Sequence, residues 1–170
     1  MPLTLRYESP QDAASIFTLN RAAFETDAEA RLVDALRAAG GLSLSLVAEL
    51  DGRLVGHIAF SPVTVSDGDA VASGVGLGPM AVLPELQRQG IGGALVTEGL
   101  RRLGGAGLGF CVVLGHAEYY PRFGFERASS HGIRWEHDVP EDVFFVQSLR
   151  PGGLEAVRGV VRYRAEFDGL

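Results

Sequence analysis

The sequence predicts an α/β fold built on one mixed sheet, and three observations support this prediction. Strand-like and helix-like segments alternate along the chain, which is typical of layered α/β domains. Residues 44–50 and 54–63 are apolar runs joined by Asp51-Gly52, a dipeptide typical of hairpin turns. Residues 110–114 are continuously apolar, as expected of a strand covered on both faces. With 170 residues, 46% of them hydrophobic, the chain is predicted to form a single domain over residues 1–170.

The N-terminal segment predicts a strand followed by two helices. Residues 3–7 alternate apolar and polar side chains, which indicates a short strand. Ser9-Pro10 then combines a helix-capping residue with proline at the first helical position, and the helix is expected to end near Phe24. A second helix is predicted from Thr26 to the pair Gly40-Gly41, which stops it.

A strand at about 75–82 is expected to lead into QRQGIGG, the glycine-rich turn (residues 87–93), and then into a helix over about 90–103. Three glycines and one proline interrupt the strand: Gly74, Gly76, Gly78 and Pro79. We therefore expect the strand to splay from its neighbour and to leave backbone groups near Met80–Val82 free for an extended ligand. In the helix, Gly92 and Gly99 share the apolar side and should let it lie close to the sheet.

The glycine-rich turn is a candidate phosphate site. The first amides of a helix have no partner inside it, and the helix dipole adds about half a positive charge there. Glycines at 90, 92 and 93 let the backbone approach an anion closely. A tight turn whose glycines serve only packing is the alternative. The P-loop pattern is absent, and the dinucleotide fingerprint would need glycine or alanine at position 95, which is leucine.

The C-terminal part predicts one turn and two further strands. In HAEYYPRFGF, Pro121 directly follows Tyr120 and is expected to reduce a helix to a turn. Strands are predicted at 143–149 and 157–163. Trp135 and the charged stretch that contains it, WEHDVPED, are predicted to form a surface loop with no assigned role.

At this point the sequence resembles a known family. VLPELQRQGIGGAL is similar to the acyl-CoA-binding segment of the GNAT superfamily of N-acetyltransferases, whose signature is [RQ]-x-x-G-x-[GA] after a strand. Gln87, Gly90 and Gly92 stand at the three signature positions. LVGHIAFSPV, GLGPMAVLP and VLGHAEYYPRFGF are similar to a bacterial subgroup usually called predicted N-acetyltransferases. The resemblance spans about residues 3–165. It implies a single mixed, largely antiparallel sheet with splayed central strands, flanked by helices.

The resemblance also implies acetyl-CoA as the cofactor, with CoA as the product and no metal. The pyrophosphate would lie on the amides of residues 88–93, and the pantetheine arm would pair with the backbone of Met80 and Val82 like an extra strand. The implied cofactor-binding residues are Met80, Ala81, Val82, Gln87, Arg88, Gln89, Gly90, Ile91, Gly92 and Gly93.

By the same resemblance, a primary amine attacks the thioester directly in a ternary complex, without a covalent enzyme intermediate. Tyr120 holds the tyrosine position of Tyr-x-x-x-Gly-Phe, which in the family points at the CoA sulfur, and it is predicted to be the proton donor to the leaving thiolate. A core tyrosine packed beside Tyr119 is the alternative. Two features depart from the family. The asparagine that many relatives carry seven residues earlier is Val113 here, and the strand GVGLGPMAV offers no titratable base.

Four residues are weaker candidates for the acceptor side of the site: Glu25, His57, His116 and Glu118. Glu25 follows the first helix, where the family's acceptor-facing loop occurs. His57 shares a strand face with Val55, Ala59 and Ser61, and a packed histidine is its alternative. His116 and Glu118 stand next to the tyrosine turn, where they would relay a proton, and a solvated loop is the alternative. They lack the further clustered ligands that a metal site needs.

Composition excludes several other classes of function. The net charge is −6, from 15 basic and 21 acidic residues, which disfavours nucleic-acid binding through a broad basic face. All basic residues are arginine, so Schiff-base and P-loop lysine chemistries are absent. Cys111 is the only cysteine, which excludes an internal disulfide and a cysteine zinc cage, and it is expected to be a buried small hydrophobe.

The remaining expectations concern location and partners. No apolar run approaches about 18 residues and the N-terminus lacks a signal pattern, so a cytoplasmic protein without membrane contact is expected. A homodimer is possible through an exposed tail strand. The acceptor is expected to be a small-molecule or peptide amine. A non-catalytic acyl-CoA-binding or sensing module and a plain interaction domain are the competing functions.

Overall fold

The computed structural model describes residues 2–169, which form two compact units. Unit 1 consists of Met1–Ser61, Gly78–Gly99 and Ala165–Leu170, apart from the two terminal residues. Unit 2 consists of Pro62–Leu77 and Leu100–Arg164. Three elements contribute residues to both units: β3 (Arg53–Asp67), β4 (Ala70–Val82) and α3 (Ile91–Gly105). The expectation of a single domain over residues 1–170 stays a prediction.

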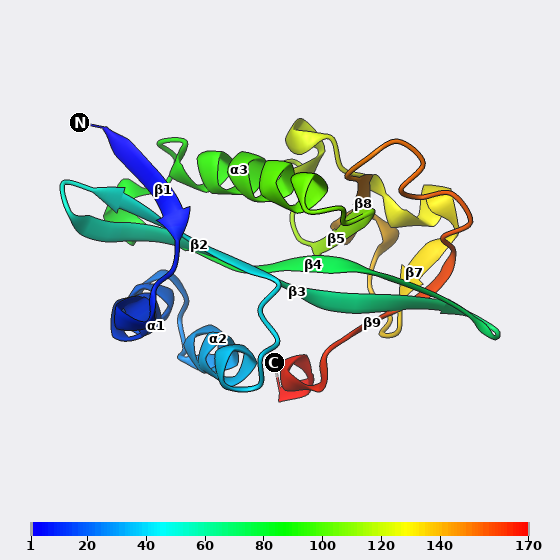
Figure 1. Ribbon diagram of the computed structural model, residues 1–170, viewed down its shortest axis with the longest axis horizontal. Helices are drawn as coiled ribbons and strands as arrows, with labels where there is room; N and C mark the ends of the chain where they lie inside the picture. The colour runs from blue at the N-terminus through cyan, green and yellow to red at the C-terminus, as the bar shows by residue number, and fades with distance from the viewer. Residues whose placement is uncertain (1, 170) are drawn as a thin grey trace. The chain divides into compact units, whose positions relative to one another are not determined.

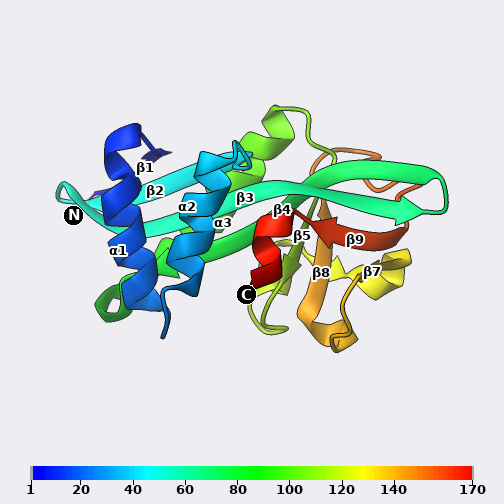
Figure 2. The same ribbon diagram turned by 90° about the horizontal axis from the view of Figure 1, so that it is seen from below.

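Unit 1 is a layer of antiparallel strands with helices on both faces (Figure 1). Its remaining elements are β1 (Leu3–Tyr7), α1 (Ala13–Ala23), α2 (Ala28–Ala38) and β2 (Leu44–Leu50). β2 pairs with β1 on one edge and with β3 on the other. Figure 2 shows α1 and α2 side by side across β2 and β3.

The alternation of side chains along β2 explains how both faces of this layer are filled. Val47 points to one face, where it packs with Ile16 of α1 and Val33 of α2 in a buried cluster. The next residue, Ala48, points to the other face beside Gly56, and a Cβ on Gly56 would lie 3.0 Å from both Ile91 and Leu95 of α3. The small residues on this face let the start of α3 lie close to the strands.

Gly99 confirms the close packing expected of α3. A Cβ at this position would lie 2.5 Å from Cε1 of Phe60 on β3, which is closer than carbon atoms approach one another. Phe60 is fully buried. The helix therefore needs glycine here because an aromatic ring occupies the space of a side chain.

The hairpin between β2 and β3 is formed as predicted. Asp51 and Gly52 have φ of 53° and 76°. A two-residue hairpin turn of type I′ requires such positive values at both central positions. β2 has the predicted bounds. The first two helices begin later than predicted: residues Pro10–Asp12 form a 3₁₀ turn before α1, and the hydroxyl of Thr26 accepts a hydrogen bond from Ala28 N at the start of α2.

Unit 2 contains the long end of the β3–β4 hairpin and a set of shorter strands. These are β5 (Phe110–Leu114), β6 (Glu126–Arg127), β7 (Ile133–Trp135), β8 (Phe144–Ser148) and β9 (Gly159–Tyr163). β4 pairs parallel with β5, β5 pairs antiparallel with β8, and β8 pairs antiparallel with β6. Their buried side chains, together with Val63 and Val65 of β3, form the core of this unit. The sheet is mixed and largely antiparallel, as predicted.

Three expectations for unit 2 are corrected. β3 continues to Asp67 because residues Val63–Ser66 pair with β9. Trp135 belongs to a strand, β7, because that segment pairs parallel with β9. β9 therefore has partners on both edges, so it is not the exposed strand that was expected to join a second subunit. Each correction depends on pairing between segments far apart in the sequence, which local patterns do not report.

The pairing of β4 agrees with the splay expected near its end. The strand runs from Ala70 to Val82, but its parallel register with β5 covers only Val75–Cys111 to Leu77–Val113, so Met80–Val82 are not paired with β5. Two of its glycines have a different role from the one expected. A Cβ on Gly74 would lie 2.5 Å from Phe110 Cε2, and one on Gly76 would lie 2.5 Å from Tyr163 Cε2. These two glycines make room for aromatic rings. Gly78 differs, since its φ of +142° is a conformation that other residues rarely adopt.

Candidate functional site

The glycine-rich turn has the backbone of an anion site. After β4, residues Pro84–Leu86 form a 3₁₀ turn and Gln87 is extended. Arg88 and Gly90 then take positive φ values of 64° and 88°, and α3 begins at Ile91. Arg88 is one of the non-glycine residues with positive φ, a conformation that carries strain and is often found at ligand-binding loops.

The amides of residues 88–93 have no acceptor within residues 2–169. The first hydrogen bond of the helix runs from Ala94 N to the oxygen of Gly90, at 3.0 Å. Six consecutive N–H groups at the positive end of a 15-residue helix are thus available to an external acceptor. The exposed Arg88 guanidinium has no carboxylate partner in the described part of the chain, so it adds an uncompensated positive charge.

Of the ten predicted cofactor-binding residues, Gln87 is the one whose side chain has a hydrogen-bond partner at this turn. Its Nε2 donates to the main-chain oxygen of Val82, the last residue of β4, at 3.1 Å. The neighbouring Leu83 N donates to Val55 O of β3 at 3.0 Å. Met80 and Val82 are half-buried, whereas Ala81 between them is buried. The end of β4 and the glycine-rich turn are therefore linked by the side chain of Gln87 as well as by the backbone between them.

Tyr120 lies in unit 2, in the 3₁₀ turn Tyr120–Phe123, which confirms the turn predicted from Pro121. Its ring is packed over Gly115, where a Cβ would lie 2.2 Å from Cε2. It also meets the rings of Tyr119 and Phe125 edge to face, with centroids 5.0 Å and 5.8 Å away. Burial raises the pKa of Tyr120 to about 12, so the phenol is protonated at neutral pH.

His116 and Glu118 are exposed residues of the turn that leads to Tyr120. The main-chain oxygen of His116 accepts hydrogen bonds from Tyr119 N at 3.1 Å and Tyr120 N at 3.4 Å. The structure thus brings His116, Glu118 and Tyr120 together in one turn of unit 2. The glycine-rich turn, Glu25 and His57 belong to unit 1. Glu25 is exposed in the bend between α1 and α2.

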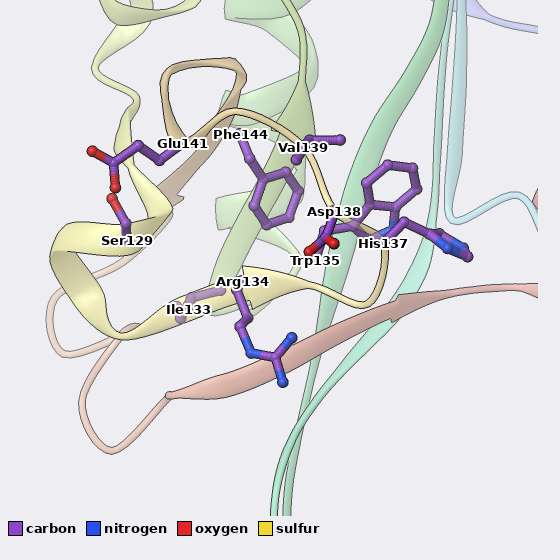
Figure 3. A pocket seen from close by; sticks show the side chains of 9 residues that line it. All are labelled: Ser129, Ile133, Arg134, Trp135, His137, Asp138, Val139, Glu141 and Phe144. Atoms are coloured by element: carbon purple, nitrogen blue, oxygen red, sulfur yellow. The ribbon is translucent and has the colours of Figure 1, made fainter.

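Unit 2 also contains a pocket of about 190 Å³ in the segment that the sequence left without a role (Figure 3). Its apolar side consists of Ile133, Trp135, Val139 and Phe144. Exposed polar and charged side chains complete the lining: Ser129, Arg134, His137, Asp138 and Glu141. The indole N–H of Trp135 is buried and has no acceptor in the described structure. The pocket is thus lined by aromatic side chains and by charged side chains of both signs.

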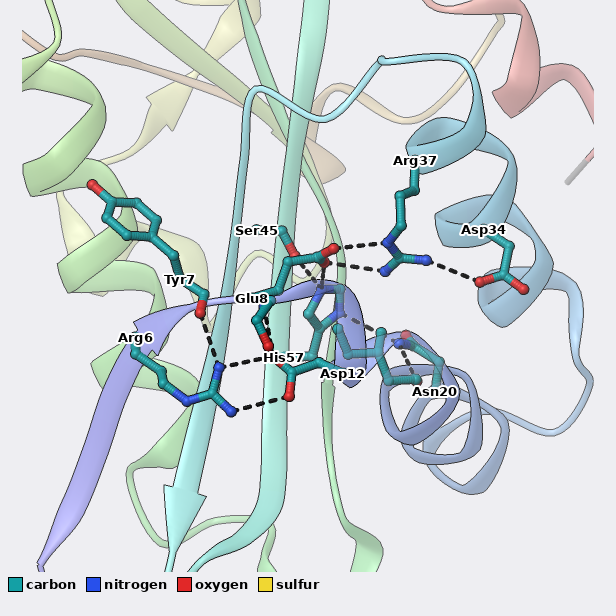
Figure 4. Close-up of polar contacts among 11 residues, drawn as sticks. Arg6, Tyr7, Glu8, Asp12, Asn20, Asp34, Arg37, Ser45 and His57 are labelled. Atoms are coloured by element: carbon teal, nitrogen blue, oxygen red, sulfur yellow. Dashed lines mark hydrogen bonds and ion pairs between the residues drawn. The ribbon is translucent and has the colours of Figure 1, made fainter.

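His57 lies at the centre of a buried polar network in unit 1 that the sequence did not predict (Figure 4). Its side chain has no exposed surface. Nδ1 lies 3.4 Å from Nδ2 of Asn20, and Nε2 lies 2.8 Å from Oγ of Ser45. The Ser45 hydroxyl also contacts Glu8, whose carboxylate is bound by Arg37 at 2.7 Å.

The direction of these hydrogen bonds follows from their chemistry. The amide nitrogen of Asn20 donates to Ile16 O at 3.0 Å, which fixes the orientation of this amide and makes its nitrogen the donor to His57 Nδ1. The imidazole proton must then be on Nε2, from which it is donated to Ser45, and the Ser45 hydroxyl donates to Glu8. This series of hydrogen bonds joins α1, α2, β2, β3 and the residue after β1. His57 therefore helps to hold α1 and α2 to the strands. Its side chain has no exposed surface, so it cannot contact the amine acceptor for which it was a candidate.

The network has a defined charge state at neutral pH. Burial lowers the pKa of His57 to about 4, so the imidazole is neutral. Burial alone would raise the pKa of Glu8, but hydrogen bonds from Arg37 and Ser45 outweigh it and hold this pKa below its usual value. Asp12, bound by Arg6 at 2.7 Å, has its pKa lowered by that hydrogen bond.

We expect the stability of the protein to fall as the pH is lowered from 7 to 5. An unfolded histidine with a pKa of 6.5 takes up a proton in this range, whereas folded His57 does not until about pH 4. The unfolded state therefore binds more protons, and the free energy of unfolding should decrease by about 2 kcal/mol. Urea unfolding at several pH values measures this slope. His57→Gln, which cannot titrate, should flatten it; an unchanged slope in this variant would show that His57 is not responsible.

Among the residues described, no group of three histidine, cysteine, aspartate or glutamate side chains is close enough to hold a metal ion. Cys111 is fully buried, as predicted, and burial raises the pKa of its thiol. No helix in the described range is long and apolar enough to cross a membrane.

Comparison with known proteins gives consistent matches. Residues 42–127 match the family described as Acetyltransferase (GNAT) domain. The chain is 42% identical over 167 residues to the uncharacterized N-acetyltransferase YhbS of Escherichia coli K12, covering 98% of this chain and 99% of YhbS. It is 37% identical over 153 residues to the uncharacterized N-acetyltransferase YjhQ of the same strain, covering 86% and 84% of the two chains.

Two solved structures extend this similarity to three dimensions. The crystal structure of YhbS from E. coli in complex with CoA has a TM-score of 0.92 and 41% identity, and covers 98% of this chain and 92% of that one. The structure of a GNAT family acetyltransferase from Brucella melitensis in complex with acetyl-CoA has a TM-score of 0.82 and 44% identity, with 98% and 99% coverage.

Proposed function

The chain belongs to the GNAT acetyltransferase family, and we propose that it transfers the acetyl group of acetyl-CoA to a primary amine by direct attack in a ternary complex. It is an acetyl-CoA-dependent acetyltransferase. The observation that carries the proposal is the row of six unpartnered amides at residues 88–93.

The residues of the glycine-rich turn fit a diphosphate. Six free N–H donors, a helix N-terminus and the unpaired Arg88 charge all favour an anion, and no carboxylate occurs between Gln87 and Gly93. We assign the diphosphate of acetyl-CoA to these amides and the pantetheine arm to the backbone of Met80–Val82. The half-buried side chains of Met80 and Val82 flank that backbone.

The acceptor must reach the thioester as a neutral amine. An alkylamine with a pKa near 10.4 is about 0.04% neutral at pH 7, a deficit of roughly 4–5 kcal/mol. The β4 strand carries no titratable side chain from Val75 to Val82, so we propose that His116 or Glu118 accepts the proton through water. Glu25, exposed after α1, is a further candidate contact for the acceptor.

We assign Tyr120 a role at the sulfur of CoA, which leaves as the acetyl group is transferred. As the amine nitrogen bonds to the thioester carbon, the carbon–sulfur bond breaks and the thiolate gains a proton overall, while the amine loses one. A phenol with a pKa of about 12 is a weaker acid than a thiol with a pKa near 8.5, so complete proton transfer from Tyr120 is unfavourable by about 5 kcal/mol. We therefore propose that Tyr120 stabilises the thiolate by a hydrogen bond, and that the proton released by the amine finally neutralises it.

Binding and turnover test the proposal separately. Acetyl-CoA at a hundred times its Kd should stabilise the protein by about 2.7 kcal/mol, seen as a shift in melting temperature that ATP does not reproduce. Release of the CoA thiol in the presence of individual amines should then identify an acceptor. Binding without thiol release across small-molecule and peptide amines would favour the acyl-CoA sensor, and the absence of a melting shift would contradict both functions.

A further inference from the structure

We infer that Gln87 is a positioning residue: its side chain ties the glycine-rich turn to the end of β4 and does not itself contact the cofactor. The inference rests on the proposed function, because it assigns the two tied segments to the two halves of one ligand. Gln87 Nε2 donates to the oxygen of Val82 at 3.1 Å. Val82 ends the strand assigned to the pantetheine arm, and the amides assigned to the diphosphate begin directly after Gln87.

The connection between these two segments is otherwise local. Leu86 N donates to Leu83 O at 2.9 Å, and Gln87 N donates to Pro84 O at 3.4 Å. These bonds close the short 3₁₀ turn but do not join it to the strand. The Gln87 side chain spans that turn and returns to a residue five positions earlier. It forms a direct hydrogen bond between the residue that precedes the free amides and the end of the strand.

The backbone just after Gln87 explains why such a tie matters. Arg88 and Gly90 both have positive φ. In the described structure, the backbone N–H and C=O groups of residues 88 and 89 make no hydrogen bonds. A strained segment without internal hydrogen bonds relaxes unless its surroundings hold it. Loss of the tie should therefore allow the turn to shift relative to β4, so a ligand that must touch both would bind less well.

The chemistry of the tie defines what can replace it. Val82 O is an acceptor, so position 87 needs an N–H donor at the end of a long side chain. Arginine supplies such donors, whereas methionine has the same unbranched length and none. Gln11, an exposed glutamine before α1 whose side chain also has no hydrogen-bond partner among the described residues, is the control for losing a glutamine outside the proposed site.

The experiment compares Gln87→Met, Gln87→Arg and Gln11→Met by calorimetric binding of CoA and of ADP. An exposed neutral hydrogen bond corresponds to about a three- to tenfold change in affinity. Gln87→Met should weaken the binding of CoA by this factor and the binding of ADP, which has a diphosphate but no pantetheine arm, by much less. Gln87→Arg and Gln11→Met should bind CoA like the wild type, and all variants should melt at the wild-type temperature without ligand.

Three results would overturn the inference: wild-type CoA affinity in Gln87→Met, failure of arginine to restore it, or equal losses for CoA and ADP, which would indicate direct contact with the diphosphate. A wild-type protein that binds no CoA would instead contradict the proposed function. In that event, amide hydrogen exchange at residues 88–90 still tests the tie, because Gln87→Met should accelerate it and Gln87→Arg should not.

Discussion

Replacing Tyr120 by phenylalanine is expected to lower turnover by about tenfold or more, while CoA affinity stays within a few-fold of the wild type. The ring packs over Gly115 and against Tyr119 and Phe125, and phenylalanine keeps these contacts. The substitution removes only the hydroxyl, whose pKa is raised by burial and which is assigned to the leaving sulfur. Steady-state thiol release with an identified amine, together with CoA binding, measures both quantities.

The adjacent tyrosine provides the control for this substitution. Tyr119 is half-buried, its ring lies 4.6 Å from the Arg122 guanidinium, and no part of the mechanism uses its hydroxyl. Tyr119→Phe should leave turnover unchanged. Equal turnover in Tyr120→Phe and the wild type would remove Tyr120 from the mechanism, and equal losses in the two variants would indicate a general effect on the turn.

Replacing Ile91 by proline is expected to weaken CoA binding by about ten- to a hundredfold. Ile91 is the first residue of α3, where proline is tolerated because its missing N–H has no partner in the helix. The preceding Gly90, with φ of 88°, is outside the helical region that proline disfavours in its neighbour. The change thus deletes one free amide, and a hydrogen bond to a charged group contributes about 1.5–3 kcal/mol.

The matched variant is Ile91→Ala, which loses the buried side chain but retains the amide. Ile91 is 7% exposed and lies against Gly56, so both variants should lower the melting temperature. Only Ile91→Pro should lower CoA affinity, as measured by calorimetry below the melting transition. Equal CoA affinity in the two variants would show that the Ile91 amide does not bind the diphosphate.

Local signals predicted much of the fold and the backbone of the candidate site. The β2–β3 turn follows from Asp51-Gly52, whose positive φ values few other dipeptides adopt. The glycine-rich turn follows from the composition of residues 87–93, since a strand, glycines and an amphipathic helix in that order leave few backbone alternatives. Such features depend on residues within one turn of each other, so a single sequence contains the information.

The buried network shows what local signals lack. Glu8, Asn20, Arg37, Ser45 and His57 come from five separate segments, and each is an ordinary polar residue in its own segment. Asn20 on the buried side of α1 is the one available hint, because a buried amide needs a partner. Which partner it finds depends on how the helices are packed on the strands.

The sequence by itself determined the position of the glycine-rich turn, because this turn depends on short-range backbone chemistry, and its resemblance to the GNAT N-acetyltransferases implied the family and the cofactor. Tertiary structure alone decided that β7 pairs with β9, that Gly74 and Gly76 make room for the rings of Phe110 and Tyr163, and that His57 is a buried anchor. The physical reason is common to all three. A side chain's role in packing or hydrogen bonding is set by atoms that folding brings to it from distant parts of the chain.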